Sequence, residues 1–274
     1  MILCDGLLCS GHVWKYFTPA FAEDHRLVHW HYPGHGRSAE PPPHADLSVP
    51  NLGVLTAEVA KHADAQGAVI VGHSLGVQVA LETWRQRPEG VRALILICGS
   101  PGKLTENFHG NAALSYAVPV LDTFSRLTPD LVTSVWRGLP DQFILMMAFQ
   151  LGEVNKRLMN RSDLLQYMSG LSRVDFSVAL KMLKHGGKHD ATPYLSEIDV
   201  PVLIVAGERD SFTPPEMSRL MASRIPGAEL LMAKGGTHSL PLEQPDLVNL
   251  RIRRFLDENL ERRDSTTWRP LPGR

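Results

Sequence analysis

The chain has 274 residues, of which 43% are hydrophobic and 21% charged, and its 28 basic and 29 acidic residues leave a formal net charge of -1. This balance argues against nucleic acid or an anionic membrane surface as the main partner, and the length suffices for one domain with an inserted segment. Cys4, Cys9 and Cys98 do not have the spacing of a disulfide framework, which indicates a reducing compartment. No apolar stretch is long enough to span a bilayer and no signal peptide is visible, so a cytoplasmic location is expected.

The first forty residues contain a short strand pattern and a cluster of histidines. Met1-Ile2-Leu3-Cys4 predicts a strand. His29 and His31, within a cluster of histidines at positions 25, 29, 31 and 35, would share one face of a strand, as metal ligands do. No carboxylate or cysteine is positioned to complete a ligand set, so we interpret the cluster as structural and expect no metal site.

The most informative motif is a G-x-S-x-G pentapeptide, Gly72-His73-Ser74-Leu75-Gly76. A helical pattern over residues 52–65 and a β-branched run over 68–71 precede it, and a second helical pattern over 77–84 follows. Strand, sharp turn and helix form the context of a nucleophile elbow, in which glycines allow close approach and the serine hydroxyl stands above the sheet. We therefore expect Ser74 to be reactive.

After a strand pattern at residues 92–97, the alternation of strands and helices stops. Helical patterns follow instead, over 117–127, 130–137, 142–151, 163–171 and 176–183. We interpret residues 102–198 as an all-helical insertion that ends in a flexible hinge at 185–190. Its most apolar helix, which packs on the core or lines an adaptable apolar pocket, carries Phe143, Met146, Met147 and Phe149.

Two later strand patterns each end in a residue that serine chemistry requires. The run 200–206 leads into Gly207-Glu208-Arg209-Asp210, and the run 228–233 leads into a glycine-containing loop that carries His238. Parallel strands present their carboxyl ends at one edge of a sheet, so these side chains are expected to meet Ser74 there. A serine hydroxyl needs a base and the base needs an orienting acid, for which Glu208 is the alternative to Asp210.

These motifs resemble those of the α/β-hydrolase superfamily over nearly the whole chain. The elbow, the G-x-x-D loop at 207–210, the G-x-H loop at 236–238 and the P-G-x-G-x-S turn at 33–38 carry the resemblance. It implies an α/β fold with a mostly parallel sheet flanked by helices. Residues 1–101 and 199–261 would form this core, 102–198 a helical lid, and 262–274 a polar tail. The two strands that usually open the sheet are missing, so we expect either about six strands or a start further upstream.

The resemblance also implies roles for individual residues. The triad would consist of Ser74 as nucleophile, His238 as base and Asp210 as acid. The oxyanion hole would come from the backbone N–H groups of Leu75 and Leu7, with Leu8 as the alternative to Leu7. Asp5 stands where the family often has the histidine of a His-Gly-x sequence, so the hydrogen bonds behind this loop are expected to differ. Two further candidates for the pocket are His12 and His73.

The sequence therefore predicts an enzyme that hydrolyses a small-molecule carboxylic ester through an acyl-enzyme, with no cofactor and no metal. Carbon–carbon bond hydrolysis and lactone opening would use the same triad, and a cofactor-free perhydrolase or haloperoxidase-like side activity is a further alternative within the fold. A ligand-binding homologue that keeps the triad without turnover is the alternative from another class. Nucleic acid and a membrane span are not expected, and the oligomeric state stays open.

Overall fold

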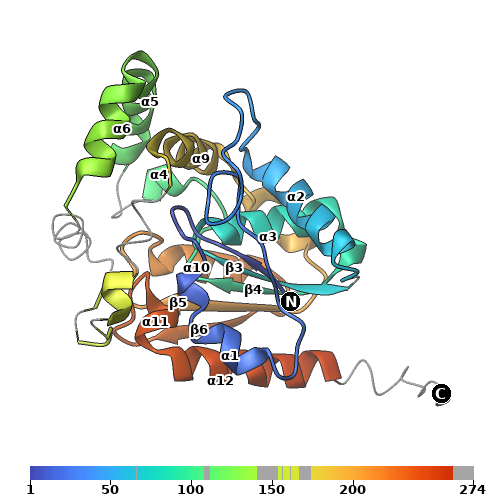
Figure 1. The fold of residues 1–274 in the computed structure, drawn as a ribbon. Helices are drawn as coiled ribbons and strands as arrows, with labels where there is room; N and C mark the ends of the chain where they lie inside the picture. The colour runs from blue at the N-terminus through green and yellow to red at the C-terminus, as the bar shows by residue number, and fades with distance from the viewer. Residues whose placement is uncertain are drawn as a thin grey trace.

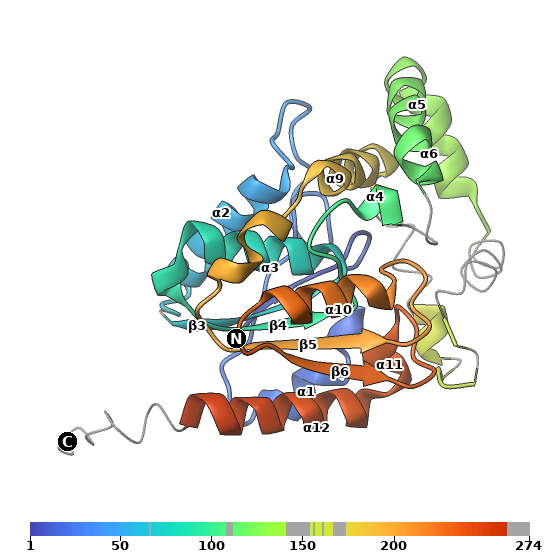
Figure 2. The same cartoon turned by 180° about the vertical axis from the view of Figure 1, so that it is seen from behind.

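The structure is a computed structural model that describes residues 1–65, 67–107, 112–140, 154–155, 157–160, 162–166 and 174–261. A single sheet lies at the centre, with helices on both of its faces (Figure 1, Figure 2). Its six strands, among the described residues, are all parallel and lie in the order β2-β1-β3-β4-β5-β6. The strands are β1 (Ile2–Cys4), β2 (Val28–His29), β3 (Ala68–His73), β4 (Val91–Ile97), β5 (Val202–Gly207) and β6 (Glu229–Ala233).

The helices divide between the two faces of the sheet and an outlying group. Helices α2, α3 and α10 cover one face, α1 and α12 cover the other, and α5 and α6 stand away from the sheet beyond α4 and α9 (Figure 1, Figure 2). The α-helices of the described residues are α1 (Phe17–Phe21), α2 (Val49–His62), α3 (Leu75–Gln86), α4 (Leu104–Asn107), α5 (Ala113–Leu127), α6 (Pro129–Gly138), α9 (Phe176–Lys188), α10 (Pro215–Arg224), α11 (Leu240–Glu243) and α12 (Pro245–Leu256). Shorter turns of 3-10 or π-helix are η1 (His12–Trp14), η2 (Pro88–Gly90), η4 (Thr192–Glu197) and η5 (Asp257–Glu261).

The apolar runs of the sequence form strands that are buried on both faces. Ile70 of β3 pairs with Leu94 of β4, and both pack in the core layer beneath α2 and α3. The next pair along, Val71 and Ile95, packs in the opposite layer with residues of α1 and α12. Successive side chains of a strand point to opposite faces, so a strand covered by helices on both sides needs apolar residues at every position. The predicted fold class, an α/β protein with a parallel sheet flanked by helices, is confirmed.

Two helices differ from the sequence prediction. Helix α2 begins at Val49 instead of residue 52, because the Ser48 side chain accepts a hydrogen bond from the Asn51 N–H and a proline occupies the first turn. Helix α9 continues to Lys188, so the predicted flexible hinge at 185–190 is wrong. The Gly186 carbonyl accepts a hydrogen bond from Gln78 Nε2 at 3.1 Å, and a Cβ at Gly186 would lie 2.9 Å from Leu75 Cδ1. The glycine therefore serves the close packing of α9 on α3.

Between β4 and β5 the described residues form helices joined by turns and loops, and they contain one isolated β-bridge. That bridge joins Gly102 to Asp190, so the two ends of the insertion leave the core side by side. The predicted helix at 142–151 and the tail 262–274 lie outside the described residues, as does the end of the predicted helix at 163–171. The role of residues 102–198 as a lid stays a prediction. Among the described residues no helix combines the length and the hydropathy needed to cross a membrane.

Candidate active site

Ser74 occupies the sharp turn between β3 and α3. Its backbone has φ 57° and ψ -119°, a left-handed conformation that non-glycine residues seldom adopt. A Cβ at Gly72 would lie 2.2 Å from the Gly76 carbonyl oxygen, and one at Gly76 would lie 2.1 Å from the Cys4 carbonyl oxygen. Both flanking glycines are therefore required, since any side chain there would push the helix away from the sheet.

Ser74, His238 and Asp210 form one hydrogen-bonded chain at the carboxyl edge of the sheet. His238 Nε2 lies 2.9 Å from Ser74 Oγ, and His238 Nδ1 lies 3.0 Å from Asp210 Oδ2. Asp210 follows β5 and His238 follows β6, so neighbouring parallel strands deliver both side chains to the end of the sheet where the elbow lies. The ring of Phe212 stacks on the imidazole of His238, with ring centroids 5.2 Å apart. The sequence-predicted triad residues are thus in mutual contact.

The Asp210 carboxylate is buried and held by its own loop. Oδ1 accepts hydrogen bonds from the Phe212 and Thr213 N–H groups, each at 2.9 Å, and Oδ2 accepts one from Thr213 Oγ1 at 2.8 Å. Burial alone would raise the pKa of Asp210, but His238 and the Thr213 donors outweigh it, so the pKa lies below its usual range. Asp210 is therefore ionised beside His238. Glu208, the alternative acid, is exposed and accepts a hydrogen bond from the Gly235 N–H instead.

The loop that carries His238 is fixed by a buried carboxylate that sequence reasoning missed. Glu243 Oε2 accepts a hydrogen bond from the Thr237 N–H at 2.8 Å, and Oε1 accepts one from Thr237 Oγ1 at 2.5 Å. Oε1 also accepts the Asn155 N–H at 2.6 Å, and Asn155 Nδ2 donates to the Gly235 carbonyl at 2.8 Å. Burial raises the pKa of Glu243 above its usual range. The inserted segment thus contributes directly to the position of the histidine loop.

The two predicted oxyanion donors flank Ser74. Leu75 is the first residue of α3, and Leu7 follows Gly6, whose Cβ, if present, would lie 2.9 Å from Ser74 Cβ. Within the described residues, no other protein group accepts a hydrogen bond from either of these N–H groups. Leu8, the alternative to Leu7, has a left-handed backbone with φ 62°. The geometry leaves the N–H groups of Leu7 and Leu75 available for a substrate oxygen.

His73 lies beneath the histidine loop and is almost fully buried. Its Nε2 donates a hydrogen bond to the His238 carbonyl oxygen at 3.0 Å, and its ring contacts the rings of Trp14 and His238. Burial lowers the pKa of His73 to about 3, so the imidazole is neutral. His12 lies in η1 and is partly buried, and burial lowers its pKa to about 4. The other predicted pocket residues lie outside the described residues: Phe143, Met146, Met147 and Phe149.

Behind the oxyanion loop, Asp5 has two histidine neighbours that the sequence analysis did not foresee. Asp5 is fully buried, accepts a hydrogen bond from Trp14 Nε1 at 2.6 Å and lies 2.9 Å from His29 Nε2. His31 Nδ1 lies 3.8 Å from the same carboxylate. Burial alone would raise the pKa of Asp5, but the favourable interactions with His29, His31 and Trp14 outweigh it and lower the pKa to about 2. The expectation that no carboxylate accompanies the histidine cluster is therefore wrong.

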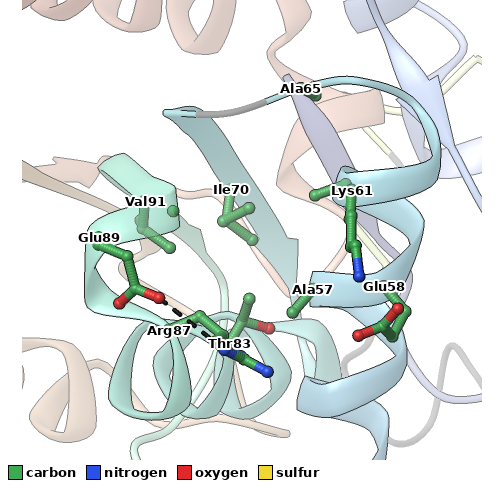
Figure 3. A pocket seen from close by; sticks show the side chains of 11 residues that line it. Ala57, Glu58, Lys61, Ala65, Ile70, Thr83, Arg87, Glu89 and Val91 are labelled. Atoms are coloured by element: carbon green, nitrogen blue, oxygen red, sulfur yellow. Dashed lines mark ion pairs between the residues drawn. The ribbon is translucent and has the colours of Figure 1, made fainter.

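A cavity of about 370 Å³ lies at the opposite end of the sheet from Ser74. Figure 3 shows its lining side chains, which come from α2 and the loop after it, α3, η2 and the first half of β3 and of β4; Arg87, just after α3, pairs with Glu89 of η2. Ligands of open parallel sheets bind at the carboxyl ends of the strands, so we do not assign this cavity to the candidate active site. A second cavity, of about 310 Å³, is apolar and lies between α5, α6 and α9; its lining includes Leu121, Phe124, Leu131, Val135, Trp136 and Phe176.

A family profile described as alpha/beta hydrolase fold matches residues 1–245. The polyketide synthase ThaQ of Burkholderia thailandensis is 27% identical over 268 residues, but the chain spans only 12% of its length. The pimeloyl-[acyl-carrier protein] methyl ester esterase of Methylococcus capsulatus is 28% identical over 81% of this chain and 80% of that protein. A hydrolase structure from Pseudomonas aeruginosa superposes with a TM-score of 0.75 at 19% identity, over 93% of this chain and 88% of that one. The chain therefore belongs to the α/β-hydrolase fold family and is an enzyme of the hydrolase class.

Proposed function

We propose that the protein hydrolyses a carboxylic ester with Ser74 as the nucleophile. One observation carries the proposal: the continuous contact from Ser74 Oγ to His238 Nε2, at 2.9 Å, and from His238 Nδ1 to the Asp210 carboxylate, at 3.0 Å. A nucleophile, a base and an orienting acid in this order define the geometry of serine acyl transfer. The relative named as a methyl ester esterase supports an ester as the substrate class.

In the proposed reaction, Ser74 Oγ attacks the ester carbonyl carbon while His238 Nε2 takes the hydroxyl proton. The negative charge that develops on the carbonyl oxygen is stabilised by the N–H groups of Leu7 and Leu75. The bond to the leaving alcohol then breaks, and His238 returns the proton to the alcohol oxygen. A water molecule, deprotonated by His238 in the same way, attacks the acyl-enzyme; the bond to Ser74 Oγ then breaks, His238 returns the proton to Oγ and the carboxylic acid is released. Asp210, ionised throughout, stabilises the imidazolium form of His238.

We also propose that the insertion at 102–198 forms the roof of the substrate pocket. The close packing of α9 on α3, through Gly186 and Leu75, supports this role because it holds the insertion beside the elbow. Phe143, Met146, Met147 and Phe149 remain predicted pocket residues.

The cysteines support a reducing compartment such as the cytoplasm as the place of action. Cys4, Cys9 and Cys98 are all buried and free of disulfide bonds.

The Ser74→Ala variant tests the proposed function. We expect its kcat/KM on p-nitrophenyl acetate to fall by on the order of 10⁴-fold or more, with an unchanged circular dichroism spectrum. A fluorophosphonate probe should label the parent and not the variant. Ser223→Ala, at an exposed serine of α10, is the matched control and should keep both activity and labelling.

Labelling that persists in Ser74→Ala would exclude Ser74 as the nucleophile. A parent protein that is labelled but turns over neither p-nitrophenyl esters nor a panel of lactones would favour the ligand-binding alternative. Faster turnover of lactones than of open-chain esters would move the assignment to lactone opening.

A further inference from the structure

Asp5, His29 and His31 bring three potential metal ligands together at the carboxyl ends of β1 and β2. The register pairs Leu3 with His29, so Asp5 and His31, two residues further along each chain segment, follow the ends of the two strands. Asp5 Oδ2, His29 Nε2 and His31 Nδ1 all lie within 4.8 Å of one another. Two imidazoles and one carboxylate form a ligand set that divalent transition metals bind in proteins.

The carboxylate of Asp5 is oriented for such a role. Trp14 Nε1 donates to Oδ1 at 2.6 Å, which leaves Oδ2 facing both imidazoles, 2.9 Å from His29 Nε2 and 3.8 Å from His31 Nδ1. A hydrogen bond to the non-coordinating atom of a ligand is the usual way in which a protein fixes a ligand's orientation. The Trp14 indole N–H therefore fixes the orientation of the Asp5 carboxylate, as outer hydrogen-bond donors do for carboxylates that coordinate a metal.

A second observation is the unsatisfied nitrogen of His31. Its Nδ1 is buried and has no hydrogen-bond partner, although it faces the Asp5 carboxylate. A buried imidazole nitrogen without a partner is unfavourable unless something fills the space before it. A cation placed between His31 Nδ1, His29 Nε2 and Asp5 Oδ2 would satisfy it. The side chain of His29 is 26% exposed, which gives an ion a route from solvent.

We propose that this cluster binds one divalent transition-metal ion, with Asp5 Oδ2, His29 Nε2 and His31 Nδ1 as its protein ligands and solvent in the open position. In the bound form each imidazole binds through an unprotonated nitrogen, so His29 carries its single proton on Nδ1 and His31 on Nε2, and any second proton is released to solvent. One anionic and two neutral ligands leave the bound site with a single positive charge.

The site is separate from the triad but adjoins it. None of the three ligands contacts Ser74, His238 or Asp210 through a hydrogen bond, yet Asp5 immediately precedes Gly6, which lies against Ser74. The ion would brace the turn that carries the Leu7 N–H without entering the proposed reaction.

Metal titration of the full chain, first treated with a chelator and dialysed, tests the proposal. We expect Zn²⁺ to bind with a stoichiometry of one per chain in calorimetry and to raise the thermal unfolding midpoint. Co²⁺ should give the visible absorption bands of a protein-bound ion. His29→Gln and His31→Gln should each weaken Zn²⁺ binding at least tenfold and abolish the Zn²⁺-dependent rise in the midpoint. His62→Gln, at an exposed histidine of α2, is the matched control and should change neither.

A parent protein that binds no stoichiometric Zn²⁺ or Co²⁺ would overturn the proposal and leave Asp5 and the histidines as a hydrogen-bonded support. Binding that stays equally tight in His29→Gln and His31→Gln would overturn it as well, because the ion would then bind elsewhere. Circular dichroism checks that each variant folds. If the more buried His31→Gln fails to fold, His29→Gln decides the question alone.

Discussion

Replacing Asp210 with asparagine should stop the proposed chemistry while preserving the site's shape. In the parent, Oδ1 accepts the N–H groups of Phe212 and Thr213, and Oδ2 faces His238 Nδ1 at 3.0 Å. The asparagine oxygen must take the place of Oδ1, because an amide NH₂ there would oppose two N–H donors. Its NH₂ group then faces His238 Nδ1, which must become an acceptor.

This reversal places the imidazole proton on Nε2, where it points at Ser74 Oγ and prevents His238 from acting as a base. The variant also loses the charge that stabilises the imidazolium. The expected loss in kcat is on the order of 10⁴-fold, which corresponds to about 5.4 kcal/mol of transition-state free energy.

The assay is the kcat and KM of Asp210→Asn on p-nitrophenyl esters, beside Glu208→Gln, whose exposed carboxylate contacts the Gly235 N–H. We expect Glu208→Gln to keep its activity within a few fold of the parent. A loss below tenfold in Asp210→Asn, or a larger loss in Glu208→Gln than in Asp210→Asn, would refute the reasoning and exchange the two roles.

Two further predictions concern the buried groups around His238. Glu243→Gln places an NH₂ group where the carboxylate now accepts Thr237 or Asn155 donors, so one buried donor loses its partner, at a cost of about 1–3 kcal/mol in unfolding free energy. Because the His238 loop then shifts, kcat should fall on the order of tenfold to a hundredfold with little change in KM. The control Glu216→Gln, at an exposed position of α10, should change neither kcat nor KM. An unaltered kcat in Glu243→Gln would show that the loop keeps its position without this carboxylate. His73 has a folded pKa of about 3 against 6.5 in the unfolded chain, so its contribution to stability is complete above pH 6.5 and is lost as the pH falls towards 3. Between about pH 7.5 and about pH 5.5 the free energy of unfolding should fall by roughly 1.4 kcal/mol because of His73. Denaturant unfolding of His73→Gln should show a pH dependence that is weaker by that amount. An identical pH dependence in the parent and the variant would contradict the assigned burial effect.

The sheet and the contacts of the predicted triad could be anticipated from the sequence because their signals are local. Each strand pattern is a short apolar run, and each reactive residue follows one of these runs within a few positions. A parallel sheet converts that arrangement into proximity, since every strand ends at the same edge. Ser74, Asp210 and His238 therefore met as predicted, although 164 residues separate the serine from the histidine.

The contacts that the sequence analysis missed depend on how distant segments pack. Asp5 meets His29 only because β1 and β2 pair in one particular register, and the histidines alone gave no sign of it. The one available signal was the aspartate itself, in a place where the family often has histidine. Asn155 and Glu243 carry no motif, and their contact arises from the path of the insertion over the histidine loop.

Local propensity also misjudged one boundary. The paired glycines at 186 and 187 favour a break in an isolated helix, but the close approach of α9 to α3 outweighs that preference. For α2, local signals would have given the correct start. Ser48 and Pro50 precede the apolar stripe and are typical of the beginning of a helix.

The attachment of Asn155 to the histidine loop has a consequence for protein engineering. A chimera that exchanges the helical insertion for that of a relative, in order to change substrate range, would remove both amide donors that hold the loop at Gly235 and Glu243. The graft should therefore keep residues 154–155 from this chain and join the foreign segment before them. A junction placed after them would alter the catalytic loop together with the pocket, and a change in specificity could not be separated from a loss of turnover.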